Sequence, residues 1–180
     1  MTDQWPRYEV FKQDRPDGPH RNVGSVHAPD AELAVLNARD VFARRPACHS
    51  LWVIPAEAIM ARTAEELATE SEEPADGEVR SQQYSVFSKQ SQRQTMTYVD
   101  YMGQVEARSA AEALRLAARA ADPPAAVWWA APTAAIVRSD EEVAAGFEAA
   151  TSKRFRLPNQ YHTVFTMRQL RRAQDEEEAE

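Results

Sequence analysis

Apolar and polar positions alternate along residues 7–13, where Tyr8 and Val10 share one face, and this alternation predicts a β-strand. Residues 16–19, with two prolines and a glycine, predict a turn. The stretch at residues 20–28 predicts a returning strand, so the first element of the chain is expected to be a β-hairpin.

Helical spacing replaces the alternation after the hairpin. Asp30 is placed to cap a helix whose apolar stripe consists of Ala31, Ala34, Val35, Ala38, Val41 and Phe42. Pro46 ends this helix. An apolar run at residues 50–54 predicts a third strand, and Pro55 begins a short helical segment toward Leu67.

The same order of patterns occurs a second time. Tyr84-Ser85-Val86-Phe87 matches Tyr8-Glu9-Val10-Phe11, and a glycine with the sequence Gly-x-Val-x-Ala recurs at Gly24 and Gly103. The second set begins with a hairpin formed by residues 83–89 and 95–106. A helix follows, which begins with a capping box of Ser109 and Glu112 and has an apolar stripe at Ala110, Ala113, Leu114, Ala117 and Ala121. A strand at 126–130 and a helical segment from Pro132 toward Phe147 complete the set.

The repeat predicts an α+β fold of two tandem small units, each a β-hairpin, helix, short strand and short helix, followed by an extended C-terminal segment. A unit of this size has a marginal core, so we expect the units to pack on each other or on another protein. The predicted boundaries are a first unit at 1–69, an acidic linker at 70–81, a divergent second unit at 82–150, and a C-terminal segment with an acidic tail at 151–180.

The composition of the chain disfavours some classes of ligand and location. A net charge of −7 disfavours nucleic acid as a ligand, because phosphate binding needs a basic face. No apolar run approaches the ~20 residues that span a membrane. The single cysteine, Cys48, excludes an intramolecular disulfide and fits a reducing cytoplasm.

Candidate chemistry is sparse. His20 and His27 are seven residues apart on one predicted strand, so they face opposite sides and cannot bind one metal together. No Glu is followed three residues later by His, the spacing of helical di-iron sites. Cys48 is expected to be a buried, inert thiol, and none of the five glycines forms a nucleotide-binding motif. We therefore predict no catalytic residue, no metal and no cofactor.

Several residues of the first unit are not retained in the second, which favours a contact role over a purely structural one. Tryptophan and arginine are also enriched at interface hot spots. On one or both of these grounds, non-retention and residue type, the residues predicted to form a partner interface are Trp5, His27, Arg39, Arg44, Arg45 and Trp52. A helix-dipole role for the two consecutive arginines and a core position for Trp52 are the alternatives.

These segments together resemble a known family, the small B subunit (PaaB) of the bacterial phenylacetyl-CoA epoxidase complex. The resemblance lies in the segments WPRYEVF at 5–11, HRNVGSVHA at 20–28, NARDVFARR at 37–45 and SLWV at 50–53. Residues 152–158 (SKRFRLP) resemble the end of the same family member, which adds Lys153, Phe155 and Arg156 to the predicted interface. Because the family member is usually a single unit, the chain resembles a tandem duplication of it.

The resemblance implies a non-catalytic assembly subunit of a multicomponent monooxygenase in aerobic phenylacetate degradation. Its implied partners are the catalytic di-iron subunit and a related supporting subunit, with the reductase of the complex as a further candidate. Two alternatives stay open: a stand-alone enzyme or ligand-binding module with a cleft between the units, and a regulator that binds an acyl-CoA through Lys153, Arg154 and Arg156.

Overall fold

The computed structural model describes residues 4–43, 48–70, 80–90, 99–140 and 143–147. The strands are β1 (Arg7–Gln13), β2 (Arg21–His27), β3 (Ser50–Pro55), β4 (Met60–Thr63), β5 (Gln82–Lys89), β6 (Asp100–Ala107), β7 (Val127–Pro132) and β8 (Val137–Arg138). The helices are α1 (Ala31–Phe42), α2 (Ala64–Thr69) and α3 (Ala110–Ala120), with 3₁₀ turns η1 (Ala56–Ala58) and η2 (Thr133–Ala135). Residues 143–147 are also helical.

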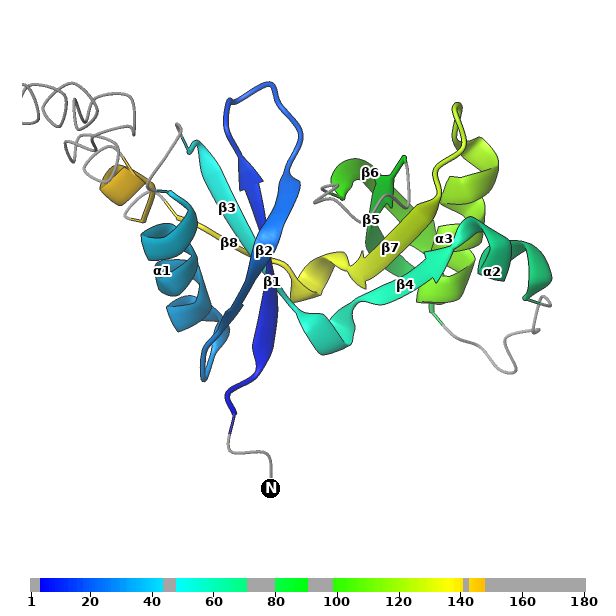
Figure 1. The fold of residues 1–180 in the computed structure, drawn as a ribbon. Helices are drawn as coiled ribbons and strands as arrows, with labels where there is room; N and C mark the ends of the chain where they lie inside the picture. The colour runs from blue at the N-terminus through cyan, green and yellow to red at the C-terminus, as the bar shows by residue number, and fades with distance from the viewer. Residues whose placement is uncertain (1–3, 44–47, 71–79, 91–98, 141–142, 148–180) are drawn as a thin grey trace, which may run out of the picture.

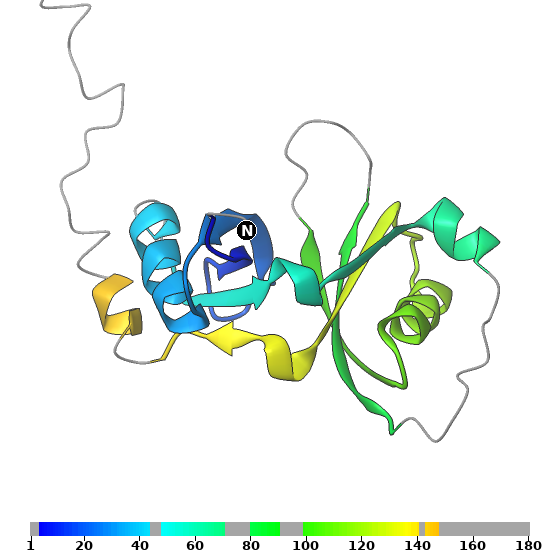
Figure 2. The ribbon, with the colours of Figure 1, turned by 90° about the horizontal axis from the view of Figure 1, so that it is seen from below.

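The fold is α+β, and its strands form one antiparallel sheet of eight in the order β4-β7-β5-β6-β2-β1-β3-β8. A single registered pair, Arg21 with Asp100, joins the two halves of the sheet through β2 and β6. Figure 1 shows α1 on one outer side and α3 on the other, with the strands between them. Figure 2, seen from below, shows the same separation of the two helices.

Two short strands cross between the halves of the sheet. β4 follows β3 in the chain but pairs with β7, and β8 follows β7 but pairs with β3. The helical segments predicted after Pro55 and Pro132 are correct only at their far ends, in α2 and in residues 143–147, since each begins as a single 3₁₀ turn and continues as a strand. Strands of four and two residues are too short to show a readable alternation, and their partners are distant in sequence.

β3 is buried on both of its faces, which explains why it is apolar at consecutive positions rather than at alternate ones. Leu51 and Val53 point into a core shared with α1, and Trp52 and Ile54 point into a central core between the two half-sheets. A third core lies between α3 and the second half-sheet. In the central core Phe11 and Phe87 meet with ring centroids 4.3 Å apart.

A matching irregularity occurs in both hairpins. The pairing register shifts between Val10 and Phe11, and again between Val86 and Phe87. Opposite these shifts, Gly24 has φ +134° and Gly103 has φ +145°, a backbone region that side chains exclude. A Cβ at Gly24 would also lie 3.1 Å from Cζ of Phe42. The two glycines of the repeat therefore serve as β-bulge positions.

The helix caps agree with the sequence at some positions and differ at others. Asp30 accepts the expected bond from Leu33 N at 2.8 Å, and Ser109 accepts from Glu112 N at 3.2 Å. The Glu112 carboxylate accepts a hydrogen bond from Arg108 N rather than from Ser109 N, so the predicted capping box is incomplete. A complete one, not predicted, begins α2. Val41 belongs to the predicted apolar stripe of α1, but it is 58% exposed.

The order hairpin, helix, strand, 3₁₀ turn, short strand and helical segment occurs twice among the described residues. The register shows which positions correspond: Trp52 pairs with Phe11 as Trp129 pairs with Phe87. The boundaries predicted at 1–69, 70–81, 82–150 and 151–180 stay a prediction, and most of the linker and all of the last segment lie outside the described residues.

Candidate interaction surface

The start of β1 and the end of β2 bring Trp5 and His27 together. Nδ1 of His27 lies 2.9 Å from the carbonyl oxygen of Trp5, and Ala28 N donates to the carbonyl of Pro6 at 3.2 Å. A carbonyl oxygen only accepts hydrogen bonds, so Nδ1 must carry the hydrogen and Nε2 is left for another contact. The Trp5 side chain is 59% exposed although the backbone around it is fixed.

A hollow of about 620 Å³ lies at this corner. Its lining combines aromatic, proline and charged residues: Gln4, Trp5, Pro6, Arg7, Tyr8, His27, Pro55, Ala56 and Glu57. Arg7 pairs with Glu9 at 3.4 Å, and Glu9 also accepts from Asn22 Nδ2 at 3.0 Å. Sequence reasoning missed Glu57, since only the fold of β3 onto β1 brings it beside Trp5. An exposed indole beside a hollow with both charge signs suits contact with another protein.

The second unit has different residues at the equivalent corner. Glu106 stands where the first unit has His27, and its carboxylate accepts a hydrogen bond from Ser81 Oγ. Ser81, two residues before Gln83, stands where the first unit has Trp5, two residues before Arg7. The described part of the second unit therefore lacks the aromatic surface of the first.

Arg39 lies away from this corner, on α1. It pairs with the neighbouring Asp40 at 3.1 Å, and a Cβ at Gly146 would lie 3.3 Å from its Cδ. Arg39 also lines a groove of about 440 Å³ between α1, β8 and the helical residues 143–147. The structure thus separates Arg39 from Trp5 and His27, which line a different hollow.

Trp52 is 8% exposed and belongs to the central core. His20 stacks on it with ring centroids 3.6 Å apart, Tyr101 meets it edge-on at 5.1 Å, and Arg138 lies 5.0 Å from its ring centroid. Its predicted part in a partner interface stays a prediction. Arg44, Arg45, Lys153, Phe155 and Arg156 lie outside the described residues.

Two enclosed titratable groups, His20 and Cys48, are held in their neutral forms at neutral pH. Burial, and then the charges of Arg138 and His49, lower the pKa of His20 to about 4, and His20 contacts Ser50 Oγ at 3.2 Å. Burial raises the pKa of the Cys48 thiol to about 11, so it stays protonated at neutral pH and is a poor nucleophile. Within the described ranges no three His, Cys, Asp or Glu side chains gather as a metal site would require.

None of the helices that the structure describes is both long enough and apolar enough to cross a membrane.

Comparison with known proteins gives two matches. The family model described as phenylacetic acid degradation B (PaaB) matches residues 4–84. The B subunit of the 1,2-phenylacetyl-CoA epoxidase of Escherichia coli K12 is 44% identical over 75 residues, which cover 42% of this chain and 78% of that protein. The family match contains the corner of Trp5 and His27 and ends within β5. No solved structure matches the chain significantly.

Proposed function

The chain belongs to the phenylacetic acid degradation B family, and we propose that it is a non-catalytic assembly subunit of a multicomponent di-iron monooxygenase that epoxidises phenylacetyl-CoA. Its task in this proposal is to bind other subunits of the complex through the first unit. The observation that carries the proposal is the exposed Trp5 beside His27, inside the family-matched region and replaced in the second unit.

The chemistry of the described residues supports an assembly role. The two side chains best suited to acid–base or nucleophilic work, His20 and Cys48, are enclosed by the core and by β3 rather than directed into either hollow. The larger hollow instead presents a solvent-exposed indole and a histidine nitrogen, groups that suit protein contact.

We further propose that the chain arose by tandem duplication of a single-unit ancestor, with units at 1–69 and 82–150 joined by the acidic linker at 70–81. The repeated bulge glycines, the matched Trp52 and Trp129, and the recurring element order support this. The exchanged strands β4 and β8 give each unit one strand of the other, so the second unit completes the fold of the first. Once freed from partner binding, its surface could diverge.

The partners in this proposal are the catalytic di-iron subunit and the related supporting subunit, with the reductase as a further candidate. The test is co-expression of the tagged intact chain with these subunits, followed by affinity purification and measurement of the ratio of subunits. Stable co-purification is expected. If neither subunit is retained, the assembly role is wrong.

A further inference from the structure

The two exchanged strands lie at the two outer edges of the sheet, and they occupy equivalent positions. Ala61 of β4 pairs with Trp129, and Arg138 of β8 pairs with Trp52. An outer edge exposes backbone N–H and C=O groups that can pair with a further strand unless side chains block them. The two edges differ in this respect.

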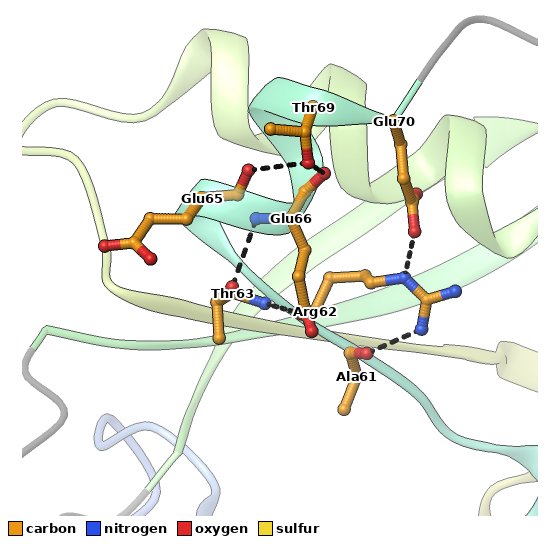
Figure 3. A network of polar contacts seen from close by, with 7 residues as sticks. All are labelled: Ala61, Arg62, Thr63, Glu65, Glu66, Thr69 and Glu70. Carbon is orange, nitrogen blue, oxygen red and sulfur yellow. Dashed lines mark hydrogen bonds and ion pairs between the residues drawn. The ribbon is translucent and has the colours of Figure 1, made fainter.

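At the edge of β4, a side chain of the same strand covers the outward-facing carbonyl of Ala61. Ala64 N donates to Ala126 O, so Ala61 lies at a non-hydrogen-bonded position of the ladder and turns its backbone outward. Its carbonyl accepts a hydrogen bond from Arg62 Nη1 at 2.9 Å, and Arg62 Nε is paired with Glu70. Figure 3 shows this guanidinium between the Ala61 carbonyl and the Glu70 carboxylate.

The edge of β8 has no such block among the described residues. Ser139 N donates to Leu51 O at 2.8 Å, so Arg138 lies at a non-hydrogen-bonded position and turns its N–H and C=O away from β3. Ser139 stands where β4 has Arg62, but its hydroxyl points inward and accepts from Leu51 N at 3.1 Å. The Arg138 side chain lies over the Trp52 ring instead of covering the edge.

Beside this edge lies the groove of about 440 Å³ that also contains Arg39. Val35, Leu36, Val137 and Val143 give it an apolar floor, and Leu36 is 37% exposed. Glu32 and Asp140 add exposed carboxylates, and Oδ1 of Asp140 accepts a hydrogen bond from Val143 N at 2.8 Å. The cations of the lining are engaged, Arg39 with Asp40 and Arg138 with Trp52. The groove therefore suits an extended segment with apolar and basic side chains.

We propose that residues 152–158 of the same chain, which lie outside the described part, add to β8 as an extended strand in this groove. From Arg154 to Leu157 basic and apolar residues alternate, so Phe155 and Leu157 share one face of a strand with Lys153, and Arg154 and Arg156 share the other. Pro158 ends the pairing segment. The basic side chains complement Glu32 and Asp140.

The position of the preceding chain supports this occupant over a separate protein. Phe147, the last described residue, is 3% exposed in the core that contains α1, and Val143 of the same helical segment lines the groove. Residues 148–152 can span up to ~17 Å, which is enough for residue 153 to enter the groove, because Val143 of the preceding helical segment already lines it. The inference stands independently of the proposed function, because it concerns only contacts within the chain.

The first test is hydrogen exchange of the intact chain, measured by mass spectrometry, with the double variant Phe155→Asp/Leu157→Asp. Loss of the added strand should speed exchange at residues 136–140 by about tenfold or more. Phe165→Asp, in the same terminal stretch, is the matched control and should leave this exchange unchanged. Equal exchange in the wild type and the double variant would overturn the proposal.

The second test is a cross-link. In a Cys48→Ala background, Leu36→Cys and Phe155→Cys should form a disulfide within one chain under mild oxidation. A disulfide between chains would show that a second copy fills the groove and would overturn the proposal, as would no disulfide at all. Leu116→Cys, on the exposed surface of α3, replaces Leu36→Cys as the control and should not cross-link to residue 155.

Discussion

His27 holds the backbone of Trp5 through a 2.9 Å contact between its Nδ1 atom and the Trp5 carbonyl oxygen, while the indole stays exposed. The imidazole thus fixes the position of a large aromatic side chain without burying it. In the second unit, the contact between Ser81 and Glu106 replaces this arrangement. The pair is therefore the most direct place to test partner binding.

Substitution of Trp5 or His27 by Ala should weaken binding of the epoxidase subunits by about tenfold to thirtyfold, since a hot-spot residue contributes about 1.4–2 kcal/mol. Titration by biolayer interferometry with the catalytic and supporting subunits measures this. Glu106→Ala, at the equivalent corner of the second unit, is the control and should bind as the wild type does. If Glu106→Ala weakens subunit binding to a similar extent, the corner of Trp5 and His27 is not the specific partner-binding surface.

The exchange of β4 and β8 predicts that both units unfold together. Leu114, on the inner face of α3, is fully buried, and Leu114→Ala should cost about 2–5 kcal/mol of unfolding free energy. β8 completes the first half-sheet and β4 completes the second. The slowest-exchanging amides of β1 and β5 should therefore show the same increase in exchange rate. Leu116→Ala, at an exposed position of α3, is the control. Faster exchange confined to β5 and β7 would mean that the units unfold independently.

His20 makes stability depend on pH. Its pKa is about 4 in the folded chain against an ordinary 6.5, so the unfolded chain binds a proton more readily. Stability due to the neutral imidazole is therefore present above pH 6.5 and is lost as the pH falls from 6.5 toward 4. His20→Phe keeps a ring against Trp52 without titrating, so its denaturation midpoint should depend less on pH in this window. Parallel midpoint curves for the two proteins would contradict the prediction.

The capping box at the start of α2 predicts a local effect. Thr63 Oγ1 accepts from Glu66 N at 3.1 Å, and Glu66 Oε2 accepts from Thr63 N at 2.7 Å (Figure 3). Thr63→Ala should cost about 1 kcal/mol in urea denaturation. Thr63→Ser retains the hydroxyl and should lose much less. Equal losses in the two variants would assign the effect to the threonine methyl group.

Calorimetry with phenylacetyl-CoA separates the assembly role from the alternative of an acyl-CoA regulator. The intact chain alone should show no saturable heat at ligand concentrations up to about 1 mM, which corresponds to roughly 4 kcal/mol of binding free energy. Saturable binding that disappears in a Lys153→Ala/Arg154→Ala/Arg156→Ala variant would support the regulator instead.

Local patterns in the sequence were enough to predict several elements. The alternation around Tyr8 and Val10 gives β1 with its observed bounds, Asp30 caps α1, and the run beginning at Ser50 forms β3. Each of these signals depends on a residue and its near neighbours, through alternation, helical spacing or a side chain that bonds the next turn. The recurring Gly24 and Gly103 are visible in the sequence, but only the structure shows that they are β-bulge positions, in a backbone conformation that glycine alone adopts easily.

The candidate surfaces were less predictable. Trp5 and His27 were singled out because the second unit lacks them, and the structure brings them into contact. Arg39 was placed in the same set but lies in another groove, and Trp52 is largely enclosed by the central core. A difference between repeats marks a residue as unusual, but it carries no information on which face of the fold that residue occupies.

The sequence by itself determined the α+β class, the repeated order of elements and the family, because these follow from local patterns and from residue identity. Only the tertiary structure decided that β4 and β8 exchange between the halves, that β3 is buried on both faces, and that one outer edge is blocked while the other is open. The physical reason is that strand pairing satisfies backbone groups between segments far apart in the chain. Partners such as Trp52 and Arg138 leave no mark on the sequence around either residue.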